Sequence, residues 1–170
     1  EKSAPVTSET VYDLSSITKV AATTLAAMFL HSRGELDLNK TLGDYLPELK
    51  TTNKGGIILS DLLAHEAGLK AFIPHYNKTL SSGKWKPAYY KDSNTEGYTL
   101  PVSNNMFAIP SLRDSLWNWT VKSELLPKPH GYEYSDLTMY FVQEVIERIV
   151  NQPLDEFVEQ NFYAPLGLHT

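Results

Sequence analysis

The chain has 170 residues, which is enough for one domain with a sizeable hydrophobic core. Hydrophobic residues make up 42%, charged residues 21%, and the formal net charge is −5, as in ordinary globular proteins. No basic patch is present, so nucleic acid is disfavoured as a partner, and the longest apolar run is too short to span a bilayer. The lack of cysteine excludes disulfides, thiolate metal sites and cysteine nucleophiles.

The first stretch that indicates chemistry is residues 12–19, YDLSSITK, at the start of a helical run. Lys19 follows Ser16 by three residues and so lies on the same helix face, where its amine can hydrogen-bond the serine hydroxyl and take its proton. About one Ser-x-x-Lys match is expected by chance in this composition, and a second occurs at Ser81 and Lys84. Gly, Asn, Pro and Ser surround Ser81, so no helix is predicted there and we interpret that match as the chance one.

The residues after Lys19 predict a helix that is buried on nearly every face. Residues 20–30 are apolar at almost every position and span about three turns. The free backbone N–H groups at the start of this helix would favour a developing oxyanion near Ser16. The alternative is that Ser15 or Ser16 only caps the helix and that Lys19 is solvated, although a lysine is mildly unfavourable in a first turn.

The rest of the chain predicts further helices and one long irregular stretch. A short helix is expected over residues 41–46, ended by Pro47, and longer ones over residues 112–119, 137–149 and 153–162. Residues 70–110 are rich in Pro, Tyr, Asn, Ser and Gly without a sustained period, as in a long functional or mobile loop. Their aromatic side chains could line a substrate groove, but we favour a role in pinning the loop. Strand signals are few, so the chain taken alone is mainly α.

A second candidate group is Tyr134, which follows a Pro/Gly break and precedes a helix. Hydrogen-bonded near an ammonium group, its phenol would ionise more easily and could shuttle a proton. The alternative is a structural tyrosine at a helix start, with Ser135 or Asp136 as the cap.

A metal site is not predicted. His65 and Glu66 suggest the H-E-x-x-H pattern, but position 69 is Leu, and the other histidines lack ligand spacing. We expect neither a metal nor a cofactor.

These motifs together resemble the serine β-lactamase-like family, which includes class C β-lactamases, penicillin-binding D,D-peptidases and related esterases. The similar segments follow the order of the family and cover nearly the whole chain except residues 70–110. They are residues 12–19 (nucleophile motif), 34–38 (turn after its helix), 45–49, 60–69 (the leucine-leucine-x-His-x-x-Gly-Leu turn), 131–136 (at the family's Tyr-x-Asn) and 164–168 (a later helix end).

The resemblance implies roles for four residues. Ser16 would be the acylated nucleophile, Lys19 the activating amine and Tyr134 a second proton-transfer group. Asp136 stands in a substrate-binding position where the family often has Asn, and an ionised carboxylate cannot donate a hydrogen bond to a substrate amide. This departure disfavours efficient β-lactam recognition and leaves ester or peptide substrates more open.

The resemblance also implies that the chain is a fragment. The family's third motif, Lys/His-Thr/Ser-Gly on a strand, has no counterpart here, nor do the opening strands of its sheet. We therefore expect residues 1–170 to be a single incomplete domain with an irregular insertion at about 70–110. This domain would be the helical part of the α+β serine β-lactamase/D,D-peptidase-like fold, with most of the β-sheet outside the chain.

The leading hypothesis is a parent serine hydrolase that forms an acyl-enzyme with an ester, amide or cell-wall peptide. We expect the fragment alone to be inactive and prone to self-association. The rival is a non-catalytic or accessory module of the same fold, joined to another enzyme such as a glycosidase. The resemblance also suggests a location in the bacterial periplasm or cell envelope.

Overall fold

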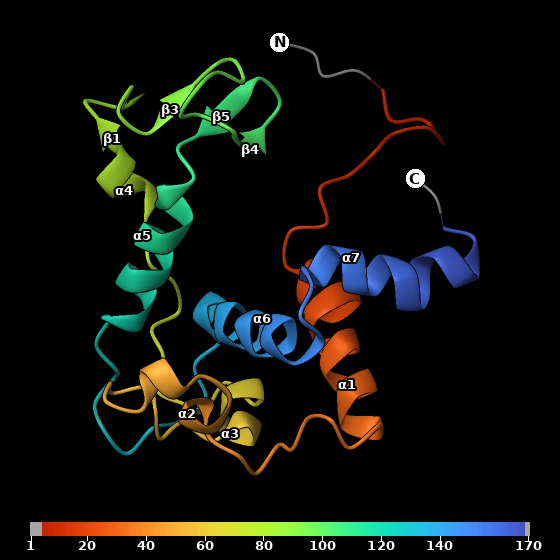
Figure 1. Cartoon of the computed structure of the whole chain (residues 1–170), viewed down its shortest axis with the longest axis vertical. Coiled ribbons are helices and arrows are strands. Elements are labelled where there is room, and N and C mark those ends of the chain that lie inside the picture. The colour runs from red at the N-terminus through yellow and green to blue at the C-terminus, as the bar shows by residue number, and fades with distance from the viewer. Residues whose placement is uncertain (1–4, 169–170) are drawn as a thin grey trace. The chain divides into compact units, whose positions relative to one another are not determined.

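The computed structural model describes residues 5–168 and divides into two compact units (Figure 1). One unit comprises the described residues up to Leu36 together with those from Ile146 onward, and the other is Asp37–Val145. The division falls within the longest helix, α6, which spans Asp136–Val150. Each unit is described by itself.

The first unit is helical. Its elements are η1 (Lys19–Thr24, a π-helix), α1 (Leu25–Ser32), α7 (Leu154–Val158), η3 (Glu159–Tyr163, also π) and η4 (Ala164–Leu166, 3₁₀). Phe29 of α1 meets the rings of Phe157 and Phe162 edge-on, with centroids 6.0 and 5.3 Å apart. The Tyr163 hydroxyl donates a 2.6 Å hydrogen bond to the carbonyl of Ala21. The two ends of the chain thus share one small aromatic core.

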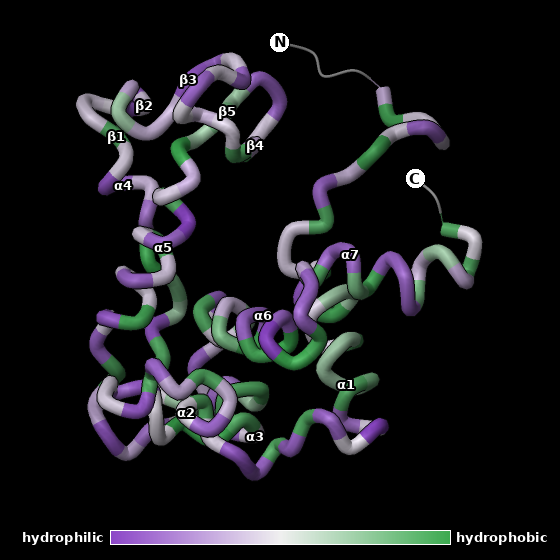
Figure 2. The backbone as a smooth tube through the Cα atoms, in the orientation of Figure 1, coloured by the Kyte–Doolittle hydropathy of each residue, from purple (hydrophilic) through white to green (hydrophobic). Residues whose placement is uncertain are grey.

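The helix that follows Ser16 is buried on one face rather than all round, so that prediction was wrong. Thr23, Ala26, Ala27 and Leu30 are buried, whereas the side chain of Val20 is 68% exposed and that of Met28 65%. Figure 2 shows α1 as mostly hydrophobic along its length. The reason is that aromatic residues of α7 and η3 pack against only one side of the helix. The opposite apolar side is not covered by other described side chains of the same unit, so it stays exposed.

The second unit holds short helices, small sheets and most of the core. Its helices are α2 (Leu42–Tyr45), η2 (Pro47–Leu49, 3₁₀), α3 (Leu59–Leu63), α4 (Tyr76–Thr79), α5 (Ser111–Val121) and the first part of α6. α6 presents Leu137, Phe141, Val142 and Val145 to the interior on one helical stripe, all essentially unexposed. Figure 2 accordingly shows hydrophobic and hydrophilic residues alternating along α6. The helices predicted over residues 112–119 and 137–149 are therefore confirmed by α5 and α6.

A capping box starts α2. The backbone N–H and the hydroxyl of Thr41 donate to the carboxylate of Asp44, at 2.9 and 2.8 Å, and these bonds lower the pKa of Asp44. Pro47 then begins η2, since proline cannot extend α2. The predicted short helix ending at Pro47 is confirmed.

The stretch expected to be irregular contains α4 and two small antiparallel sheets. One pairs β1 (Leu80–Ser81) with β2 (Lys84–Trp85), and the other has the order β3 (Tyr90–Lys91), β5 (Met106–Ala108), β4 (Leu100–Ser103). Ser82 and Gly83 form the hairpin turn, with φ of 50° and 73°, and Ser81 pairs directly with Lys84. The second Ser-x-x-Lys match is thus a hairpin, and the prediction that no helix forms there is confirmed.

One lysine is part of the core. Lys54 is fully buried, and its ammonium group donates to the side-chain oxygen of Asn53 and to the carbonyl of Ser123. The side-chain amide of Asn53 donates to the same carbonyl at 3.1 Å. Burial, helped by the positive charge of Lys70, lowers the pKa of Lys54 to about 8. These bonds join the turn before α3 to the end of α5.

Candidate active site

Ser16 lies at the transition from an extended segment to the first helix. Ser15 has φ of +46°, in the left-handed region that side chains rarely adopt, and its N–H donates to the Asp13 carboxylate at 2.8 Å. From there the backbone turns, and the N–H of Lys19 donates to the carbonyl of Ser16 at 3.1 Å. A strained residue directly before a candidate nucleophile is the kind of outlier that clusters at functional sites.

The side chains of Ser16 and Lys19 meet as the spacing predicts. The Nζ of Lys19 donates to the Oγ of Ser16 across 3.0 Å, with Ser16 exposed and Lys19 half-buried. The π-helix η1 begins at Lys19, and its N-cap is Thr18 without a side-chain cap bond. Ser16 directly precedes the helical residues Ile17 and Thr18, which is the position that the capping alternative gives it. Short π-helical segments are frequent at functional sites.

Tyr134 belongs to a segment that is held on both sides by the turn at residues 65–71. The N–H of Glu133 donates to the carbonyl of His65 at 2.9 Å, and that of Asp136 to the carbonyl of Ala71 at 2.8 Å. Ser135 is fully buried, and its hydroxyl donates to the carbonyl of Lys70 at 2.6 Å. These bonds fix the backbone on either side of Tyr134, whose side chain remains partly exposed.

The start of α6 explains why the flanking residues have these types. The Oγ of Ser135 accepts a hydrogen bond from the N–H of Leu137 at 3.1 Å, so Ser135 caps the helix, as the structural alternative supposed. Asp136 is the first residue of α6 and is half-buried. Because Ser135 does the capping, neither Tyr134 nor Asp136 is needed for it.

His65, for which the sequence suggested only a metal-binding role, contacts the segment that holds Tyr134. The Nδ1 of His65 accepts a hydrogen bond from the N–H of Ser135 at 3.1 Å and lies 3.2 Å from the hydroxyl of the buried Thr138. Its ring also packs on that of Tyr134, with centroids 4.9 Å apart. Since Nδ1 accepts from an N–H, the proton of the neutral ring lies on Nε2. The histidine of the 60–69 turn therefore packs on the ring of Tyr134 and holds the backbone of the next residue.

The four predicted site residues fall into two pairs. Ser16 and Lys19 belong to the first unit, whereas Tyr134 and Asp136 belong to the second. The contact within the first pair and the backbone anchoring of the second are features of each unit by itself. No group of three or more metal-ligating side chains occurs among residues 5–168. Over the same residues, no helix has the length and apolar character needed to cross a membrane.

Comparison with known proteins gives consistent results. The family model named Beta-lactamase matches residues 1–170. A protein of Escherichia coli strain K12 named D-alanyl-D-alanine carboxypeptidase is 29% identical over 179 residues, covering 100% of this chain and 36% of its own length. The similarly named protein of Salmonella typhimurium strain LT2 is 31% identical over 174 residues, covering 96% of this chain and 34% of its own. The chain thus spans about a third of the length of these relatives.

Solved structures share the fold. The beta-lactamase/D-alanine carboxypeptidase of Pseudomonas syringae superposes with a TM-score of 0.64 at 23% identity, over 98% of this chain and 38% of that one. The mainly helical character of this chain, with few and short strands, confirms that it holds the helical part of that fold. With a matching family model over every residue, the chain belongs to the beta-lactamase family of serine hydrolases.

Proposed function

We propose that Ser16 is the nucleophile of an acyl-transfer reaction and that Lys19 is the base that activates it. The observation that carries this proposal is the 3.0 Å contact between the Lys19 Nζ and the Ser16 Oγ at the start of a helix. A serine hydroxyl is a weak nucleophile unless an adjacent group takes its proton, and the distance lies within hydrogen-bond reach. Membership of a serine hydrolase family supports the same assignment.

The reaction proceeds in two steps. In its amine form, Lys19 accepts the proton of Ser16 while Oγ attacks the substrate carbonyl, forming an ester with the enzyme and breaking the bond to the leaving group. The proton taken from Ser16 ends on the departing amine or alcohol, with Tyr134 as the group that relays it, so Lys19 and Tyr134 both return to their starting forms. A water molecule then attacks the ester, and its proton returns to Ser16 as the acid product leaves.

The substrate class follows from the relatives and from Asp136. Because the relatives are named D-alanyl-D-alanine carboxypeptidases, peptides that end in two D-alanine residues are the first class to test. When ionised, Asp136 accepts hydrogen bonds but cannot donate one to a substrate amide, which disfavours β-lactams and keeps ester substrates as the second class to test. The bacterial relatives support a location in the cell envelope, where such peptides occur.

The test is covalent labelling of the full-length protein. A fluorophosphonate or penicillin-type probe should modify Ser16, and mass spectrometry of the digested protein locates the modification. Ser16→Ala should abolish both labelling and turnover, whereas Ser81→Ala, at the other Ser-x-x-Lys match, should change neither. Label on Ser81, or turnover that survives Ser16→Ala, would contradict the assignment. A protein with neither label nor turnover would favour the accessory-module alternative.

A further inference from the structure

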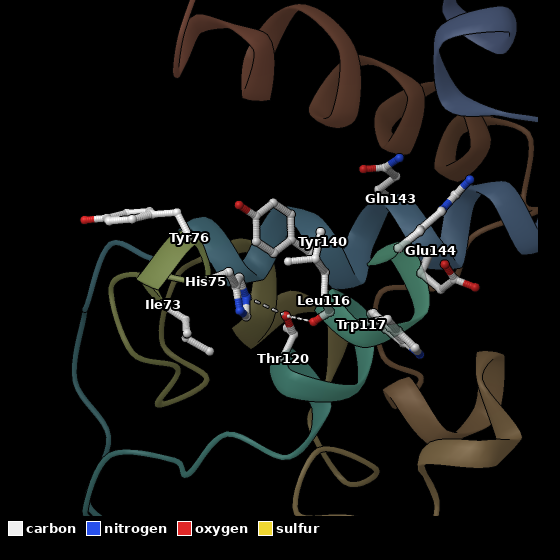
Figure 3. A pocket seen from close by; sticks show the side chains of 10 residues that line it. Ile73, His75, Tyr76, Leu116, Trp117, Thr120, Tyr140, Gln143 and Glu144 are labelled. Carbon is white, nitrogen blue, oxygen red and sulfur yellow. Dashed lines mark hydrogen bonds between the residues drawn. The ribbon is translucent and has the colours of Figure 1, made fainter. Parts of the chain in front are cut away.

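A pocket of about 480 Å³ lies in the second unit, apart from the residues assigned to acyl transfer. Three elements line it, and Tyr134 and Asp136 are not among its residues (Figure 3). α5 contributes positions i, i+3, i+4 and i+7 of one face, and α6 contributes i, i+3 and i+4. The lining residues are Ile73, His75 and Tyr76 near α4, Arg113, Leu116, Trp117 and Thr120 on α5, and Tyr140, Gln143 and Glu144 on α6. The volume lies within the usual range of small-molecule sites.

The floor of this pocket is held rigidly by hydrogen bonds. The hydroxyl of the buried Thr120 donates to the carbonyl of Leu116 at 2.9 Å, so it accepts from the Nε2–H of His75 at 3.2 Å (Figure 3). These two hydrogen bonds place the ring proton of His75 on Nε2, and its Nδ1 is buried without a hydrogen-bond partner. Burial and the nearby charge of Lys78 lower the pKa of His75, so the ring is neutral at neutral pH.

The walls are aromatic and are also fixed by packing. Trp117 meets Phe141 of the core edge-on, with centroids 5.3 Å apart, and His75 stacks on Trp119 at 5.8 Å. Tyr140 and Gln143 project from one side of α6 in Figure 3. A ligand would therefore meet a preformed site with flat apolar surfaces, phenol groups and one side-chain amide.

The charges of the lining residues indicate the ligand's charge. Arg113 and Glu144 carry opposite charges and His75 is neutral, so the lining has no net charge. We propose that this pocket binds a neutral aromatic molecule carrying an amide, at a site separate from the acyl-transfer residues. The ring would pack on the aromatic and leucine walls, and the amide would exchange hydrogen bonds with the polar lining groups.

The proposal is tested with N-acetyl-L-phenylalaninamide, which is neutral and carries one ring and two amides. Titrated into the full-length ¹⁵N-labelled protein, it should shift the indole N–H resonance of Trp117 with saturation, at a dissociation constant on the order of 1 mM as expected for a ligand of this size. The resonance of Trp85, which lies outside the pocket, should not move. The anionic N-acetyl-L-phenylalanine should bind at least about tenfold more weakly, because its carboxylate would lose hydration among lining residues whose own charges sum to zero.

Variants separate this pocket from other sites. Leu116→Trp should fill the pocket and Tyr140→Ala should remove a wall, each weakening binding at least about tenfold. Tyr140 is 47% exposed, so its truncation should leave the fold intact. Phe72→Ala is the matched control, since it removes an exposed ring that does not line the pocket, and it should not affect binding. Ser16→Ala should also bind normally, whether or not Ser16 is the nucleophile. Non-saturating shifts, equal binding of the anion, or unchanged affinity in both pocket variants would overturn the proposal.

Discussion

The buried Lys54 predicts an unusual dependence of stability on pH. Its pKa is about 8 in the folded chain, against an ordinary value of 10.5. Between these two values the unfolded chain binds a proton that the folded chain does not, so the free energy of unfolding should rise as the pH increases from 8 to 10.5. At 1.36 kcal/mol per pKa unit, the rise attributable to Lys54 is about 3 kcal/mol. Below pH 8 both states are protonated and the contribution is constant.

The variant Lys54→Met isolates this effect. Methionine has a similar length and no charge, and the carbonyl of Ser123 keeps its bond from the Asn53 amide, so the variant should fold. Urea unfolding followed by tryptophan fluorescence at pH 7, 8, 9 and 10 gives the free energy of unfolding of each protein. The wild type should gain about 2.5 kcal/mol relative to Lys54→Met between pH 7 and pH 10, and subtraction removes the ionisation of tyrosines common to both.

An exposed lysine provides the control. Lys50 lies on the surface a few residues earlier, and Lys50→Met should give a pH profile parallel to that of the wild type. Lys54→Ala should instead be destabilised at every pH, by about 2–4 kcal/mol, since it leaves a cavity. Parallel profiles for the wild type and Lys54→Met would refute the reasoning, because they would mean that the ammonium is not desolvated in the folded protein.

The remaining predictions concern the candidate site and its frame. Tyr134→Phe in the full-length protein should keep the fold but lower kcat by ~10²–10⁴, and unimpaired turnover would reduce Tyr134 to a structural residue. Asp136→Asn should have a milder effect and raise the kcat/KM of amide relative to ester substrates, by restoring a donor; an unchanged ratio would exclude contact with the amide. Gly68→Ala should cost about 1–3 kcal/mol in unfolding free energy, because its Cβ would lie 2.4 Å from the His130 ring at φ of +69°, and equal stability would argue against that packing. Residues 1–170 expressed alone should show little turnover, since loss of half an oxyanion hole costs ~10²–10³ in rate; robust ester hydrolysis would contradict this.

Periodicity predicted the longer helices well. The stripe from Leu137 to Val145 repeats at helical spacing, and α6 follows it closely. The contact between Ser16 and Lys19 was also predictable, since it depends only on residues three apart in one helix. Local patterns of this kind need no knowledge of the rest of the chain.

What the sequence did not reveal depends on distant residues. Lys54 stands in a turn rich in Gly, Thr and Asn, where a lysine is expected in water. Its burial is made tolerable by the side-chain oxygen of Asn53 together with the carbonyl of the distant Ser123. The strands between Leu80 and Ala108 are two to four residues long, too short for a clear alternation. His65 accepts a hydrogen bond from the N–H of Ser135, which is 70 positions later in the sequence. No local sequence pattern predicts a contact over that separation.

The anchoring of residues 133–136 by the turn at residues 65–71 has a consequence for how such a protein can change over time. The excursion of about sixty residues between these two segments starts and ends at the hydrogen bonds that join them. Insertions, deletions or wholesale replacement within the small sheets can therefore occur without moving the phenol of Tyr134. The small sheets of this excursion are therefore the natural place to graft foreign loops, because the hydrogen bonds that hold residues 133–136 lie outside those sheets.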